Sequence, residues 1–106
     1  METPTLDERL IALADGTRRR LLVALTESDP RPVRPEASAD PPVPLDEETV
    51  IELTHVHLPL LSTAGYVEWD RENAVVSSGP CFEAIEPLLT TLESHDEDLL
   101  VNGQPD

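Results

Sequence analysis

A proline-rich segment near the middle of the chain limits where regular structure can form. Residues 29–44 read DPRPVRPEASADPPVP, in which six of sixteen positions are proline. Proline fixes φ and lacks the amide donor that a helix interior needs. We therefore expect residues 29–44 to be an extended surface loop, with the regular elements on either side of it.

The residues before this loop predict two short helices. Thr5 and Glu8 have the spacing of a capping box, and leucines at helical spacing follow, which predicts a helix over residues 6–14. Asp15 can cap a second helix from residue 16 to about residue 28. Positive side chains in the first turns of this second helix oppose its dipole, so we expect a carboxylate or a phosphate to compensate them. These side chains are Arg18, Arg19 and Arg20.

After the loop, the pattern predicts a long helix, a hairpin and a final helix. Asp46 is a candidate cap for a helix over residues 46–64, in which Pro59 should cause a kink and after which Gly65 ends it. The period then changes from 3.6 to 2, which predicts strands at 66–69 and 74–77 around a turn at 70–73. Apolar residues from Phe82 to Leu92 predict a helix that kinks or restarts at Pro87.

This order of elements predicts one α+β domain. The domain should cover residues 1–93 and be mostly helical, with a β-hairpin and a flanking C-terminal helix. The acidic residues 94–106 should form a disordered tail.

The charge of the chain bears on its partners. The 106 residues contain 22 Asp and Glu, seven Arg and no Lys, for a net charge of −15. Such acidity normally argues against nucleic acid binding, which needs basic side chains. However, an acidic chain without Lys and with few aromatics is typical of a high-salt cytoplasm, where at roughly 1 M salt the Debye length is only about 3 Å. DNA binding therefore stays open, and we expect a cytoplasmic, halophilic protein.

Two motifs resemble those of ArsR-type transcription regulators. LADGTRRRLL at residues 13–22 is similar to the "ALADPTRLRIL" opening of that family, and HLPLLSTAGYV at 57–67 is similar to its "HLKVLREAGLV" recognition-helix end. The sequences HVHLP and AGYVEWD are closer still to haloarchaeal winged-helix domains of poorly defined function. The resemblance covers residues 6–78 and implies a winged helix-turn-helix fold, a DNA-binding regulator and a homodimer. The family's helix between the two motifs is replaced here by the proline-rich segment.

The resemblance suggests which residues would contact DNA. Arginines at a helix start and at the wing would hold phosphates, and polar residues of the helix over 46–64 would face the groove. Pairing of the arginines with the chain's own carboxylates is the alternative, and Glu48 and Glu52 would repel DNA. The candidate DNA-binding residues are Arg18, Arg19, Arg20, Thr54, His55, Ser62, Arg71 and Asn73.

The first and last predicted helices carry more apolar residues than a small core needs. In the resembling family such flanking helices form a homodimer, and the alternative is that these residues close the core of a monomer. The candidate dimer residues are Leu6, Leu10, Leu13, Phe82, Ile85, Leu89 and Leu92.

Other functional classes have little support in the sequence. His57 shares the apolar phase of its helix and should be a core residue bonded to a backbone carbonyl, whereas His55 should be exposed. The lone Cys81 excludes an internal disulfide, and with no CxC or CxxC spacing we expect no metal site and no cofactor. No catalytic motif, signal peptide or membrane-spanning run is found, so we expect neither an enzyme nor a membrane protein. A winged-helix module that binds a protein partner and has lost DNA binding is the alternative function.

Overall fold

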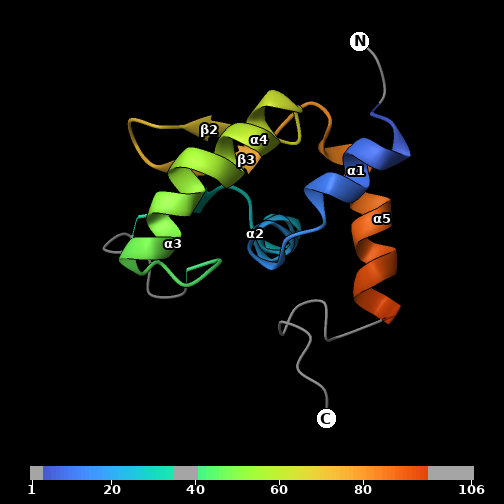
Figure 1. Cartoon of the computed structure of the whole chain (residues 1–106), viewed down its shortest axis with the longest axis horizontal. Helices are drawn as coiled ribbons and strands as arrows, with labels where there is room; N and C mark the ends of the chain where they lie inside the picture. Colours follow the sequence, from blue (N-terminus) through green and yellow to red (C-terminus); the bar gives the residue numbers. More distant parts are fainter. Residues whose placement is uncertain (1–3, 35–40, 96–106) are drawn as a thin grey trace.

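The computed structural model describes residues 4–34 and 41–95 and has an α+β architecture (Figure 1). The predicted tail covers residues 94–106. Residues 94 and 95 belong to the last helix, which therefore runs two residues past the predicted domain end at 93, and residues 96–106 lie outside the described residues. The elements in chain order are α1 (Leu6–Ala12), α2 (Gly16–Glu27), β1 (Arg31–Pro32), α3 (Glu47–Glu52), η2 (Leu53–His57), α4 (Leu58–Thr63), β2 (Val67–Asp70), β3 (Val75–Ser78) and α5 (Phe82–His95).

The predicted helix starts are confirmed by their side-chain caps. The Thr5 amide donates to Glu8 Oε1 at 2.8 Å, and the Glu8 amide donates to Thr5 Oγ1 at 3.1 Å, which completes the capping box of α1. Asp15 caps α2, and Asp46 accepts from the amide of Thr49 at the start of α3. These caps are contacts between residues two or three positions apart, so a local sequence pattern is enough to predict them.

The predicted helix over residues 46–64 forms, and it contains a five-residue π-helical stretch. This stretch, η2, ends two residues before Pro59, and the amide of Leu58 donates to the carbonyl of Leu53. Proline lacks an amide hydrogen and crowds the carbonyl four residues before it, so a wider turn just upstream relieves that conflict. The irregularity expected at Pro59 thus takes the form of a π-helical turn before it.

The sequence predicts that the proline-rich segment is an extended surface loop. In the structure, part of the segment is a strand and part of it is buried. Arg31 and Pro32 form strand β1, which pairs antiparallel with Val76 and Val75 of β3, and the sheet order is β1-β3-β2. A proline is tolerated in an edge strand because its missing amide hydrogen leaves no partner unpaired in the sheet interior. Val33 and Val43 of the same segment are buried in the core. No helix lies between Glu27 and Glu47 in residues 28–34 and 41–46, so there the expected absence of helix is confirmed.

The hairpin forms one residue later than predicted. β2 and β3 pair from Val67 with Ser78 to Asp70 with Val75. Gly65 has a φ of +85° and follows α4, as expected for the residue after a helix end. Gly79 lies so close to this turn that a Cβ on it would come within 2.5 Å of the Gly65 carbonyl oxygen.

One hydrophobic core joins the helices to the sheet. Figure 1 shows α2 end-on at the centre, with α3, α4 and the sheet on one side and α1 with α5 on the other. Leu21 and Leu22 of α2, Leu61 of α4, Val76 of β3 and Ile85 of α5 are fully buried. The helix α5 runs without interruption from Phe82 to His95, with Pro87 inside it. Of the two predicted outcomes at Pro87, a kink or a restart, the restart is therefore wrong.

Candidate functional site

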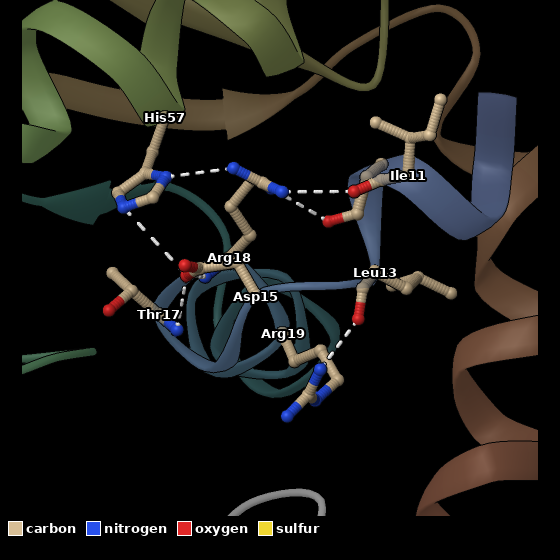
Figure 2. A network of polar contacts seen from close by, with 8 residues as sticks. Ile11, Leu13, Asp15, Thr17, Arg18, Arg19 and His57 are labelled. Atoms are coloured by element: carbon tan, nitrogen blue, oxygen red, sulfur yellow. Dashed lines mark hydrogen bonds and ion pairs between the residues drawn. The ribbon is translucent and has the colours of Figure 1, made fainter. Parts of the chain in front are cut away.

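Arg18 was predicted to hold a DNA phosphate, but it is buried inside the domain and this prediction is wrong. Its side chain is only 8% exposed. Figure 2 shows the guanidinium between His57 and the end of α1, with Nε donating to the Ala12 carbonyl and Nη2 to the Ile11 carbonyl, both at 2.9 Å. These carbonyls end α1, where the helix dipole favours a positive charge. Arg18 therefore connects α2 to the end of α1 and is unavailable to a ligand.

His57 completes this buried contact. Arg18 Nη1 lies 3.0 Å from His57 Nδ1, and His57 Nε2 lies 3.7 Å from Asp15 Oδ1 (Figure 2). Because a guanidinium can only donate, Nδ1 accepts and the ring proton resides on Nε2, facing Asp15. Burial, together with the Arg18 charge, lowers the pKa of His57, although Asp15 and Glu52 act in the opposite direction. The predicted core position of His57 is confirmed, but its partner is a guanidinium and not a backbone carbonyl.

The same network contains groups that compensate the positive charge of the arginines at the start of α2. Asp15 Oδ1 accepts from the amides of Thr17 at 2.8 Å and Arg18 at 3.2 Å. Burial raises the pKa of Asp15, but these two amides and His57 outweigh it and keep the pKa below its usual value. Arg19 Nη1 donates to the Leu13 carbonyl at 2.6 Å. Carbonyl oxygens at the end of α1, in addition to the Asp15 cap, thus compensate this charge.

Two other predicted residues, Thr54 and Arg71, come together in one hollow between η2 and the hairpin. We call it the Arg34–Arg71 hollow; its volume is about 290 Å³. The Arg71 guanidinium carbon lies 4.6 Å from the centre of the Trp69 ring, over its face. Arg34, which sequence reasoning missed, approaches from the proline-rich segment. The hollow is lined by Val33, Arg34, Val50, Leu53, Thr54, Leu58, Trp69, Arg71 and Ala74.

The remaining candidate DNA contacts do not line this hollow. Asn73 donates from its amide and from Nδ2 to the Asp70 carboxylate, at 3.1 and 2.8 Å, so it closes the hairpin turn. The Asn73 side-chain hydrogen bond is the main reason that the pKa of Asp70 is lowered. Ser62 is half-buried in α4. Arg20 lines a separate depression beside Glu27 and Arg31.

The outward face of α3 and η2 combines acidic and apolar side chains. Ile51 is 54% exposed and Val56 is 51% exposed. The exposed Glu48 and Glu52 lie on the same stretch, and His55 is exposed as predicted. The sequence analysis identified the two glutamates as unfavourable for DNA binding but did not predict the exposed apolar side chains on the same stretch.

The candidate dimer residues divide into two groups. Leu13, Phe82, Ile85 and Leu89 are buried within one copy of the chain, so here they close the core, as the monomer alternative holds. Leu6 and Leu10 lie exposed on α1, and Leu92 is half-buried on α5. Ile11, which was not among the candidates, is also exposed.

Among residues 4–34 and 41–95, no three His, Cys, Asp or Glu side chains gather in a way that could hold a metal ion. Cys81 is half-buried, with Sγ beside Gly65. None of the helices in the described ranges is long and apolar enough to cross a membrane.

Comparison with known proteins gives no relative. No protein-family model, no curated protein and no solved structure matches the chain.

Proposed function

We propose that the chain is a winged-helix DNA-binding regulator of the ArsR type that works at high salt. In this proposal the helix formed by α3, η2 and α4 faces the major groove, and the hairpin of β2 and β3 is the wing. The observation that carries it is the Arg34–Arg71 hollow, where two of the seven arginines meet Thr54 between these two elements.

The chemistry of the hollow suits a phosphate of a DNA backbone. A guanidinium presents a planar fork of donors that matches phosphate oxygens. Arg71 is exposed and stacks on Trp69, which restricts its side chain while leaving its donors accessible. Phosphate contacts of this kind position a protein on DNA without reading its sequence.

Base reading would be limited. The polar groups of the helix that suit base edges are few, among them Thr54, His55 and Ser62, and the exposed Glu48 and Glu52 lie on the same helix. We therefore expect modest sequence preference, and binding that tolerates the acidic surface only where salt screens it.

The test is DNA binding by the full chain over a KCl series, with pooled genomic fragments. Arg34→Ala and Arg71→Ala should each weaken DNA binding about three- to tenfold. Each should also lower the slope of the logarithm of affinity against the logarithm of salt concentration by roughly one, the value for one lost phosphate contact. Arg31→Ala is the matched control, because it removes the same charge from a residue outside the hollow. Equal affinity of all four proteins would contradict the proposal, as would a folded wild type that binds no fragment at any salt.

A second candidate function, a protein-interaction module, is favoured by the exposed Ile51 and Val56 on the helical stretch that also exposes Glu48 and Glu52. An apolar surface with acidic neighbours suits a basic, amphipathic partner helix. Titration with a helical peptide that has Leu at positions i, i+3, i+4 and i+7 and Arg on its opposite face tests it. Ile51→Ser should abolish binding, whereas the exposed control Leu10→Ser should not; binding lost equally in both would mean nonspecific adsorption.

A further inference from the structure

A groove lies between α1 and α4. Its volume is about 770 Å³, within the usual range of small-molecule sites. Ile11 and Glu8 line it from α1, and Pro59, Leu60 and Thr63 line it from α4. Tyr66, which follows α4, also lines it. This α1–α4 groove shares no lining residue with the Arg34–Arg71 hollow.

Tyr66 brings an unpaired polar group to this groove. The residue is 1% exposed, and its hydroxyl has no hydrogen-bond partner among the described residues. Its backbone is satisfied, because the amide donates to Leu61 at 3.0 Å and the carbonyl accepts from Gly79 at 2.9 Å. A buried hydroxyl without a partner lowers stability, and a phenylalanine would fill the same space without this cost.

The charged groups that act on this hydroxyl include side chains of α1. Burial raises the pKa of Tyr66, and the charges of Glu8 and Arg9 on α1 act on the same group. The Tyr66 hydroxyl therefore stays protonated at neutral pH and can donate to an acceptor or accept from a donor.

The polar rim of the groove is acidic and fixed in place. Glu8 Oε1 accepts from the Thr5 amide in the capping box, so the carboxylate is held where it lines the groove. Arg9 does not line the groove; its Nη1 donates to the Ala84 carbonyl and its Nε to the Thr5 carbonyl. A carboxylate at the rim disfavours an anion and favours a neutral or cationic group.

We propose that the α1–α4 groove binds a small neutral or cationic amphiphile, whose apolar part lies between Ile11 and Leu60 and whose polar group bonds the Tyr66 hydroxyl. The assignment does not rest on the proposed phosphate contacts, since the groove shares no lining residue with the Arg34–Arg71 hollow. Ile11 and Leu60 supply the apolar contact area, Tyr66 the hydrogen bond and Glu8 the charge selection.

Three probes of one shape test the assignment: 2-phenylethanol, 2-phenylethylamine and phenylacetate. Each is titrated into the isotopically labelled full chain, at the lowest KCl concentration that keeps it folded, and amide chemical shifts are followed. The alcohol and the amine should shift amides of α1, α4 and Tyr66, and phenylacetate should bind more weakly. Tyr66→Phe should weaken binding of the alcohol about two- to tenfold, the equivalent of one net hydrogen bond.

Matched variants separate the groove from general hydrophobic binding. Thr63→Leu fills the groove and should weaken all three probes, whereas Thr90→Leu makes the same change on an exposed position of α5 that does not line it. Shifts centred elsewhere, or unchanged affinity of Tyr66→Phe in a folded sample, would overturn the proposal. The affinity for the probes could instead fall as the protein concentration rises, with a dimer seen by sedimentation. That result would assign the groove to a second copy of the chain and would also overturn the proposal.

Discussion

Nη1 of Arg18 lies 3.0 Å from Nδ1 of His57, and this contact joins α2 to the π-helical stretch η2. The same guanidinium bonds two carbonyls at the end of α1. One side chain therefore connects three helical segments inside the domain. An arginine can do this because its planar fork presents donors in several directions at once.

Replacing Arg18 should destabilise the fold strongly. Arg18→Ala leaves the Ile11 and Ala12 carbonyls and His57 Nδ1 without their donor, so we expect a loss of about 2–4 kcal/mol in the free energy of unfolding. Arg20→Ala, two positions along in the same run and half-buried, should cost about 1 kcal/mol or less. Urea unfolding of both variants in KCl measures the difference, and equal losses would contradict the structural role of Arg18.

Stability should fall with acid through His57. Its pKa is lowered in the folded chain, chiefly by burial, so the unfolded chain binds a proton more readily. Its contribution to stability is complete above the ordinary histidine pKa of about 6.5 and is lost as the pH falls below that value. His57→Gln can still accept from Arg18 but cannot titrate, so it should flatten this part of the stability profile.

His55→Gln is the control for that measurement, because His55 is exposed on the same helical stretch. Unfolding curves for the wild type and both variants between pH 7 and 5 compare the three slopes. If His55→Gln flattens the profile as much as His57→Gln, the buried histidine is not the titrating group.

Substitutions in the two flanking helices should have different effects: those of buried residues should lower stability, and those of exposed residues should affect only association. Ile85 is fully buried, so Ile85→Ala should cost about 2–5 kcal/mol of unfolding free energy. Leu10 is exposed on α1, so Leu10→Ser should change stability by no more than about 0.5 kcal/mol. Sedimentation of the wild type and Leu10→Ser then tests whether α1 forms a dimer. A dimer lost only in Leu10→Ser would support association through α1; identical sedimentation of the two would contradict it.

Gly79 should tolerate no side chain. A Cβ there would lie 2.5 Å from the Gly65 carbonyl oxygen and 2.9 Å from the Val67 carbonyl carbon, so the turn after α4 would have to move away from the start of α5. We expect Gly79→Ala to lower the unfolding free energy by about 2 kcal/mol or more, as backbone clashes of this kind do. Ala84→Gly, a helix substitution in the adjacent α5, should cost only about 1 kcal/mol. Thermal unfolding of both variants checks the order, and an equal or smaller loss for Gly79→Ala would contradict it.

The features that depend on neighbouring residues could be predicted before the fold was known. The capping residues Thr5, Asp15 and Asp46 begin the predicted helices, and Gly65 follows the end of α4 with a positive φ. The alternation after Tyr66 predicts the hairpin to within one residue. Each of these features is an interaction or a backbone preference within a few residues, so its energy can be read from a short segment.

The tertiary structure alone decided which polar side chains face outward and which segments pair. Arg18 meets His57 across 39 positions of sequence, and β1 forms because β3 offers it a partner. Arg34 and Arg71 likewise reach one hollow only after the proline-rich segment folds against the hairpin. The pattern around Arg18 is that of an exposed cation in a first helical turn, and nothing local distinguishes it from its neighbours. The burial of an arginine depends on donors and acceptors meeting in space, and those partners are supplied by distant parts of the chain.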